Sequence, residues 1–530
     1  MLIVYQIIWL KPQTKNLLSL NMEFIKKNFH YLLLLSSVFF LGNPSKFPSD
    51  DGFFYPQIAY NIMNHGFMGF NDLYLTNGFH PLWMVFCVIA ELINPSDKFF
   101  ALNILWLFQV LLILFGYILL EKTILKESKV GKILSLGFYC FMFFSLGTLY
   151  LIEAHLTFFT FSLIIFFMCR KFTNDLAFGV ICSLVFLARL DHVFVLIPFG
   201  FLYWNFRKWS IKSFVKMLIG FSVLAVPYII SNYYYFDAAV PISGRIKSSF
   251  PHIQQYMDLG VFQKLFTLVG VLYFVFLCFN KKDTFRAIKF SFLIGSLLQL
   301  FYNLLFQSEI GQWYFVSQMF FCGLFIYDIA NSFSNKTFEK LSFDKIIFMV
   351  ALIFVCGIAW LKLTTSFSIQ NNVFASHSKF EKKSNDLVRQ TAQEFEQNIP
   401  KKTRIYVYDF PGKFAFYSDF NVIPADGLVA NKLYFNDMRS GNFKKFMIKN
   451  NIEYLLFPTH FHTKHQTQGF LALHVDSRTD DYVFKLRNTL RKTIIDSLKE
   501  SELTKIKSYT NPIKTWQPQY DSVSVFKLKN

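Results

Sequence analysis

The chain has 530 residues, of which 53% are hydrophobic and only 16% are charged. This balance excludes an ordinary soluble protein and is typical of one that crosses a membrane many times. The formal net charge is +19, but the basic residues lie in short clusters between apolar runs, where they orient helices in a bilayer. We therefore expect an integral membrane protein with membrane lipids as neighbours and with no nucleic-acid partner.

The first apolar run lies near 28–44, directly after two lysines. No small-x-small cleavage site precedes the polar residues that follow it, which favours a retained signal-anchor helix over a cleaved signal peptide. Residues 1–27 are then a cytoplasmic N-terminal segment. Met22 stands just before this unit, which leaves open that 1–21 are an upstream extension.

The middle of the chain is a series of apolar runs, each compared with the twenty or so residues that a membrane helix needs. The run 79–93 is only about fifteen residues long and contains Pro81 and Glu91, so it could span or lie along the interface. If it lies along the interface, nearly all basic clusters share one side, the cytoplasm by the positive-inside rule. We therefore predict a transmembrane domain over 28–362 with about eleven spans, the later ones near 99–120, 131–151, 154–169, 176–188, 193–206, 216–236, 261–279, 287–306, 313–331 and 346–362.

The composition changes abruptly near residue 363, after which charges are frequent. Helical periodicity over about 380–398 and β-like runs at 404–408 and 454–457 predict a soluble α/β domain over 363–530. The predicted topology places this domain outside the cytoplasm. All seven cysteines lie in or beside apolar segments, so neither a disulfide nor a cysteine zinc site is expected.

Two adjacent carboxylates, Asp50 and Asp51, follow the first apolar run in the predicted first outer loop. Neighbouring carboxylates raise each other's proton affinity, so one of them can serve as a general base or, with the other, bind a metal ion. Asp before a helix is also a common N-cap, and capping and catalysis are about equally supported by this pair alone.

The predicted topology places several other polar residues on the same outer face. Glu153 and His155 interrupt an apolar stretch, and Arg189 and Asp191 lie at a break between two short helices. Ionisable groups at membrane depth need a partner, a wet cavity or a function. A helix-end Glu and a simple Arg–Asp pair are the structural alternatives, and they stay open.

The segment Pro241-Ile242-Ser243-Gly244-Arg245-Ile246-Lys247 combines a glycine with two cations, which suits phosphate oxygens. A basic loop that contacts lipid headgroups is the alternative. Trp313 and Tyr314 are either aromatic anchors at the membrane interface or a platform for a sugar ring.

The order of these motifs resembles a known family. Asp-Asp-Gly-Phe-Phe-Tyr, Asn-Gly-Phe-His-Pro-Leu-Trp, an outer Glu, Ala-Arg-Leu-Asp, Pro-x-Ser-Gly-Arg-x-Lys and Trp-Tyr are similar to those of GT-C superfamily glycosyltransferases, in particular bacterial protein O-mannosyltransferases and aminoarabinose transferases. The resemblance implies a GT-C fold with interfacial helices in the first outer loop, a polyprenyl-phosphate sugar donor, and a C-terminal domain outside the bacterial inner membrane.

The resemblance also implies a reaction, inverting transfer of a hexose or pentose to an acceptor hydroxyl. Asp50 or Asp51 would be the general base, and Arg245 and Lys247, with Arg189, would bind the donor phosphate. Mg²⁺ or Mn²⁺ at Asp50 and Asp51 is left open as a cofactor. The remaining candidates are expected to contact substrate: Tyr55, His80, Glu153, His155, Asp191, Ser243, Trp313 and Tyr314.

The acceptor class stays open among a glycan, a glycolipid and a protein. Two other functions also stay open: a transporter or lipid flippase, and a non-catalytic glycolipid-binding protein of envelope assembly. Against a transporter, the sequence has no inverted repeat and no paired broken helices.

Overall fold

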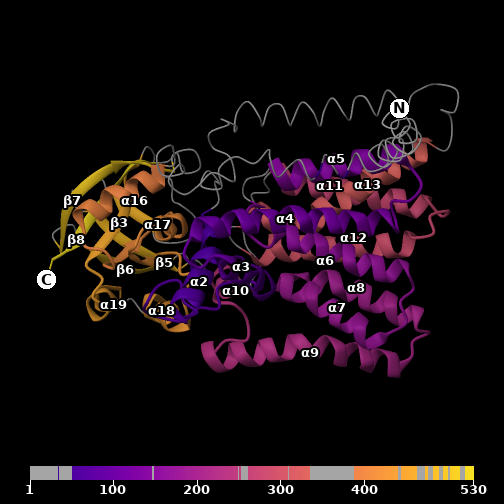
Figure 1. Ribbon diagram of the computed structural model, residues 1–530, viewed down its shortest axis with the longest axis horizontal. Coiled ribbons are helices and arrows are strands. Elements are labelled where there is room, and N and C mark those ends of the chain that lie inside the picture. Colours follow the sequence, from indigo (N-terminus) through magenta and orange to yellow (C-terminus); the bar gives the residue numbers. More distant parts are fainter. Residues whose placement is uncertain are drawn as a thin grey trace, which may run out of the picture.

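A bundle of apolar helices and a C-terminal unit built around a sheet lie one after the other along the long axis of the molecule (Figure 1). The computed structural model describes residues 31, 34, 50–145, 149–248, 250–251, 253, 261–307, 310–334, 387–439, 443–461, 472–475, 482–488, 493–498, 502–513 and 520–529. The spans predicted near 28–44 and 346–362 lie outside this part of the chain, apart from residues 31 and 34.

The helices of the bundle begin and end close to the predicted spans. They are α4 (Lys98–Glu121), α5 (Lys129–Ser145), α6 (Ala154–Cys169), α7 (Asp175–Ala188), α8 (Val193–Phe206), α9 (Ile211–Phe236), α11 (Val261–Phe279), α12 (Arg286–Phe306) and α13 (Val316–Ser334). Polar N-cap residues determine where several of these helices begin, because a side-chain oxygen of the cap accepts hydrogen bonds from backbone N–H groups in the first turn. Asp97 caps α4, Asn174 caps α7 and Ser210 caps α9.

Four segments of the described chain are long and apolar enough to cross a membrane: Lys98–Glu121, Ile211–Phe236, Arg286–Phe306 and Gln312–Ser332. Shorter apolar helices, among them Ala154–Cys169 and Asp175–Ala188, lie beside them. The protein is therefore a polytopic α-helical membrane protein, as predicted. The count of about eleven spans stays a prediction.

Short elements lie between the bundle and the sheet (Figure 1). The first are α2 (Asp51–His65) and α3 (Pro81–Ile93), and α3 has 13 residues with proline at its start. At about 1.5 Å per residue it is too short to cross a bilayer of about 30 Å upright. The helix α10 (Ile242–Lys247) also lies there. Two 3₁₀ turns, η3 (Leu190–His192) and η4 (Gln312–Phe315), directly precede α8 and α13.

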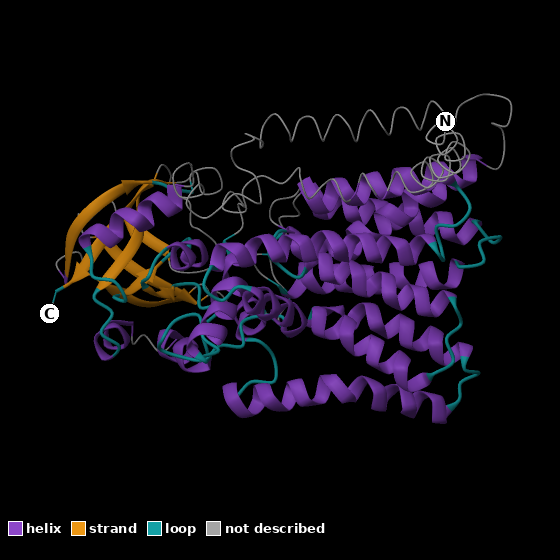
Figure 2. Cartoon of the chain, viewed as in Figure 1, coloured by secondary structure: helices purple, strands orange, loops and turns teal. Residues whose placement is uncertain are grey.

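The C-terminal unit is α/β, as predicted (Figure 2). Its elements are α16 (Leu387–Asn398), β1 (Arg404–Val407), α17 (Pro411–Tyr417), β2 (Asn421–Pro424), α18 (Lys432–Arg439), α19 (Phe443–Lys449), β3 (Tyr454–Phe461), β4 (Ala472–Val475), β5 (Tyr482–Asn488), β6 (Thr493–Leu498), β7 (Leu503–Thr510) and β8 (Tyr520–Leu528). The main sheet has the order β2-β1-β3-β8-β7, and β4-β5-β6 form a second sheet. β1 pairs in parallel with both β2 and β3, and α17, α18 and α19 supply the crossovers that parallel strands require.

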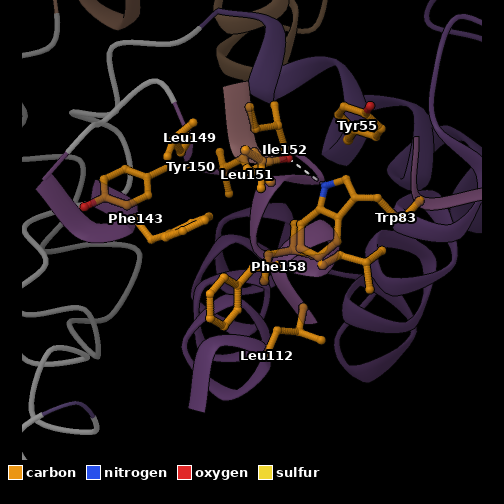
Figure 3. Packing of buried hydrophobic residues seen from close by; sticks show 14 of the residues in the cluster. Tyr55, Trp83, Leu112, Phe143, Leu149, Tyr150, Leu151, Ile152 and Phe158 are labelled. Carbon is orange, nitrogen blue, oxygen red and sulfur yellow. Dashed lines mark hydrogen bonds between the residues drawn. The ribbon is translucent and has the colours of Figure 1, made fainter. Parts of the chain in front are cut away.

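The core of the bundle is aromatic and continues toward the C-terminal unit. Trp83 is fully buried, and its indole N–H donates to the Leu151 carbonyl at 2.8 Å (Figure 3). Further along, the Phe53 ring of α2 lies 5.3 Å from that of Phe416 in α17. Phe99 of α4 also contacts the Phe416 and Tyr417 rings. Such ring pairs add stability beyond their buried area, so the two parts share one apolar core.

The loop 66–80 also joins the two parts through polar contacts. The Asn71 amide donates to the Val422 carbonyl at 3.0 Å, and the Thr76 hydroxyl donates to the Ala430 carbonyl at 2.7 Å. A Cβ on Gly78 would lie 2.0 Å from the Leu428 carbonyl oxygen, so only glycine permits this approach. The C-terminal unit is thus fitted closely onto the elements that carry the first candidate motifs.

Candidate active site

The predicted acidic and basic motifs meet at one point. Asp51 is the first residue of α2 and Lys247 the last of α10, and their Oδ2 and Nζ atoms are 3.9 Å apart. The Asp51 side chain is 31% exposed, whereas Lys247 is 7% exposed. Burial raises the pKa of Asp51, and the Lys247 cation opposes that rise. The pair therefore offers a carboxylate open to a ligand beside a buried cation.

Two aromatic rings from the turn η4 lie next to this pair. The Lys247 ammonium is 5.9 Å from the Trp313 ring centroid and 5.8 Å from that of Tyr314. The Arg189 guanidinium lies 4.1 Å from the same Tyr314 centroid. Both cations are within the range of attraction to the face of an aromatic ring. Tyr314 thus connects Lys247 with the second basic motif.

Arg189 is held by two carboxylates. Its Nη1 donates to Glu153 at 2.8 Å, and its Nε donates to Asp191 at 2.9 Å. Gln299 of α12 donates to the other Asp191 oxygen at 2.9 Å. Arg189 and Glu153 are almost completely buried, and buried charges need such pairing. The guanidinium is therefore fixed in place, with its charge compensated by its neighbours.

Tyr55 and His80 complete this network around Glu153. The Tyr55 hydroxyl donates to Glu153 Oε2 at 2.9 Å and accepts the His80 backbone N–H at 3.3 Å. His80 Nε2 lies 3.6 Å from Glu153 Oε1. Burial lowers the pKa of His80, which favours a neutral imidazole at pH 7. Three segments, which carry Tyr55, His80 and Arg189, thus converge on the Glu153 carboxylate.

Asp50 is engaged differently from Asp51. Its two carboxylate oxygens accept the backbone N–H groups of Gly412 at 2.9 Å and Lys413 at 2.7 Å, at the start of α17. The side chain is buried. Burial raises the pKa of Asp50, and the two N–H donors oppose the rise. Asp50 thus does act as a helix cap, although the helix it caps is in the C-terminal unit and not the one it precedes.

The C-terminal unit also contributes a carboxylate that the sequence analysis missed. Asp426 follows the parallel strand β2, and its Oδ1 accepts the Leu428 backbone N–H at 2.9 Å. Burial raises its pKa to about 7, the Asp51 carboxylate adds to the rise, and Lys247 opposes it. The available signal was its place at the carboxyl end of a parallel strand, where ligands often bind in open α/β sheets.

Two predicted residues, Arg245 and His155, have contacts away from this cluster. Arg245 is exposed and lies over the Phe435 ring of α18, 5.6 Å from its centroid. His155 is buried among aromatic rings, and its Nε2 lies 3.1 Å from the Phe143 carbonyl. Ser243 lies one turn before Lys247 on α10, and residues four apart on a helix share a face. The structure brings together Asp51, Tyr55, His80, Glu153, Arg189, Asp191, Lys247, Trp313 and Tyr314.

The carboxylates Asp50 and Asp51 do not suit a divalent cation. Within the ranges that the structure describes, no group of three His, Cys, Asp or Glu side chains is arranged to hold a metal ion. Both oxygens of Asp50 already accept backbone N–H groups. Asp50 and Asp51 therefore do not form the oxygen cage that Mg²⁺ or Mn²⁺ prefers.

Comparisons with known proteins give a distant structural likeness. The chain is similar to the crystal structures of ArnT from Cupriavidus metallidurans in the apo state and bound to undecaprenyl phosphate. Each alignment covers 83% of this chain and 93% of the ArnT chain, at 11% sequence identity and a TM-score of 0.48. No family model and no curated protein matches the sequence. An identity of 11% assigns no role to any residue, so the roles below come from the contacts of this chain.

Proposed function

We propose that this protein is an inverting glycosyltransferase of GT-C type that moves a sugar from a polyprenyl-phosphate donor to an acceptor hydroxyl. The observation that carries the proposal is the Asp51–Lys247 pair, a partly exposed carboxylate 3.9 Å from a buried ammonium. Transfer from a phosphate-linked sugar needs a base for the acceptor and a positive charge for the leaving phosphate. The two groups supply these at one place.

The proposed reaction is a single displacement. Asp51 takes the proton of the acceptor hydroxyl as its oxygen forms a bond to the anomeric carbon. The bond from that carbon to the phosphate oxygen breaks, and the polyprenyl phosphate leaves with the electron pair. Lys247 stabilises the charge that develops on the phosphate. Attack on the face opposite the leaving group inverts the anomeric configuration.

The contacts favour Asp51 over Asp50 as the base. A general base must reach the proton that it removes, and Asp51 has a partly exposed side chain beside the cation. Both oxygens of Asp50 are occupied by Gly412 and Lys413. We assign Asp50 the role of holding the C-terminal unit against the start of α2.

Arg189 and Tyr314 have a supporting role in this proposal. Glu153 and Asp191 fix the guanidinium, and a fixed cation lowers the reorganisation that charge development requires. The ring faces of Tyr314 and Trp313 can contact the apolar face of a sugar. The buried hydrogen bond from Tyr55 to Glu153 holds Glu153, and with it Arg189, at a fixed position relative to α2.

The direction of the helices supports an extracytoplasmic site. α6 begins beside Glu153, α7 ends beside Arg189, and α8 begins just after Asp191. Their other ends therefore lie away from the site, and Arg170 and Lys171 follow α6 there, as Arg207 and Lys208 follow α8. α12 contacts the site through Gln299 in its second half, so Lys281, Lys282 and Arg286 before and at its start lie toward the same far end. The positive-inside rule makes that end cytoplasmic. We propose that the site and the C-terminal domain face outward from a bacterial inner membrane, with the N-terminus in the cytoplasm.

The test uses the full chain in proteoliposomes with a labelled polyprenyl-phosphate sugar and extracted envelope glycolipids, glycans and proteins as acceptors. The proposal expects labelled product and an equal amount of released polyprenyl phosphate. Movement of intact donor across the bilayer without release would instead indicate a flippase. Donor binding that survives Asp51→Asn with no product from any acceptor would indicate a non-catalytic binding protein.

A further inference from the structure

The motif Asn-Gly-Phe-His-Pro-Leu-Trp contains one polar residue that the proposed mechanism does not use. Asn77, the first residue of the motif, lies in the loop 66–80 and is only 3% exposed. A buried amide needs hydrogen-bond partners for both its oxygen and its NH₂ group. Within the described chain, the partners of this side chain belong to α9, to α10 and to the segment between them.

The Asn77 amide joins three consecutive parts of this connection. Its Nδ2 donates to Asn232 Oδ1 on α9 at 3.3 Å and to the Val240 carbonyl at 3.4 Å. Its Oδ1 accepts the backbone N–H of Ile242, the first residue of α10, at 3.1 Å. One side chain of the first outer loop thus holds α9 and α10 on either side of the segment 237–241.

The contact with Ile242 serves as the cap of α10. The residue before the helix is Pro241, whose side chain makes no capping hydrogen bond. Ile242 is 2% exposed, and a buried N–H without an acceptor is costly. Asn is among the residues that cap helix starts best. Here the capping oxygen comes from another part of the chain, 165 residues earlier.

The start of α10 largely determines where its last residue, Lys247, lies. The helix has six residues, so Lys247 lies only about 7.5 Å along the axis from Ile242 at 1.5 Å per residue. Beyond Lys247, Ser248 forms a β-bridge with Gln307. That bridge holds the end of α10 to the chain after α12, whereas Asn77 holds its start to the first outer loop.

We propose that Asn77 is a positioning residue of the catalytic centre, which caps α10 and so places Lys247 opposite Asp51. The Lys247–Asp51 distance of 3.9 Å depends on how α10 lies relative to α2. Three residues after Asn77, the His80 backbone N–H donates to the Tyr55 hydroxyl of α2 at 3.3 Å. The loop therefore refers the position of α10 to that of α2. This inference rests on the proposed function.

The first experiment does not depend on activity. A water-soluble carbodiimide joins neighbouring carboxylates and amines, and peptide mass spectrometry of the full-length protein in detergent measures the Asp51–Lys247 cross-link. The exposed Lys401–Asp419 pair, at 2.7 Å, provides an internal standard. We expect Asn77→Leu to lower the relative yield about fivefold, the population change that corresponds to the loss of one helix cap. Asn77→Asp should retain most of the yield, because Asn and Asp cap helices about equally well.

Two further variants separate capping from packing. Asn77→Ala also lacks the capping oxygen but introduces no larger side chain, so it should lose as much cross-link as Asn77→Leu. The matched control is Asn71→Ala, because Asn71 lies in the same loop and is also 3% exposed, but its amide donates to the Val422 carbonyl. It should cross-link like wild type. A wild-type yield in Asn77→Ala, an equal loss in Asn77→Asp, or an equal loss in Asn71→Ala would each overturn the proposal.

The second experiment measures transfer in proteoliposomes. Asn77→Ala should raise the donor KM and lower kcat by about fivefold each, again the value of one cap, and Asn77→Asp should recover most of both. The acceptor KM should stay at the wild-type value, because Asp51 lies on α2. Wild-type donor kinetics in Asn77→Ala would overturn the positioning role. A wild-type protein that releases no polyprenyl phosphate would overturn the proposed function, and the cross-links would still decide whether Asn77 places Lys247.

Discussion

Substitution of Asp50 should weaken the docking of the C-terminal unit, whereas substitution of Asp51 should abolish transfer without changing the fold. In Asp50→Asn, one amide oxygen can still accept an N–H, but the NH₂ group meets the second N–H of the Gly412–Lys413 pair. Hydrogen bonds to a charged group contribute about 1.5–3 kcal/mol each, and a buried unpaired donor adds a similar cost. We expect the docked form of the C-terminal unit to lose roughly 2–4 kcal/mol, about a 30- to 1000-fold change in its equilibrium.

Asp51→Asn should behave in the opposite way. The carboxylate is partly exposed and its distance to Lys247 is 3.9 Å, and such ion pairs contribute about 0–1 kcal/mol to stability. The fold should be unchanged. Loss of a general base lowers the rate by about 10²- to 10⁴-fold, so transfer should fall by that factor.

The assay combines limited proteolysis of the C-terminal unit in detergent with transfer in proteoliposomes. Asp50→Asn should be cleaved faster than wild type, and its residual transfer should track the intact fraction. Asp51→Asn should resist protease like wild type and lack transfer. If Asp50→Asn resists protease and is inactive while Asp51→Asn transfers normally, the assignment of the two roles is reversed and the reasoning fails.

Three further outcomes are expected. Lys247→Gln should reduce kcat/KM for the donor by about 10- to 100-fold, the value of one charge-assisted phosphate contact, and an unchanged donor KM and rate would contradict the phosphate role. Gly78→Ala should loosen the C-terminal unit by about 1–3 kcal/mol, because the new methyl group would lie 2.0 Å from the Leu428 oxygen; wild-type protease resistance would show that the loops can separate at no cost. Burial raises the pKa of Asp426 from 3.8 to about 7, so the folded protein binds more protons than the unfolded one between about pH 4 and 7, and stability falls as pH rises through that window. Asp426→Asn should therefore raise the Tm relative to wild type more at pH 8 than at pH 5, and a pH-independent difference would argue against the raised pKa.

The length of the apolar runs and the polar residues between them were enough to predict the helices of the bundle. A bilayer requires long apolar helices, and capping residues mark where such helices begin. The strands at 404–408 and 454–457 were visible for a similar reason, since β-branched and aromatic residues alternate there. These signals are local, so one sequence contains them in full.

The composition of the site was only partly predictable. The predicted topology put Asp51, Arg189 and Lys247 on the same outer face of the membrane. The sequence analysis also expected Arg245 and Lys247 to bind the donor phosphate together. Residues two apart on a helix point about 200° away from each other, and α10 is helical, which explains why Arg245 turns to Phe435. Asp50 and Asp426 depend on contacts across more than 350 residues, and local periodicity carries no information about such contacts.

The close fit of Gly78 against Leu428 and of Asp50 against Gly412 has a consequence for biogenesis. These contacts join the first outer loop to a segment made more than three hundred residues later. In the proposed topology, the loop lies outside the bilayer without these contacts until the segment around Gly412 and Leu428 has been translocated and has folded over it. In this proposal a newly inserted chain becomes competent to handle its lipid substrate only after the segment around Gly412 and Leu428 has folded against the loop.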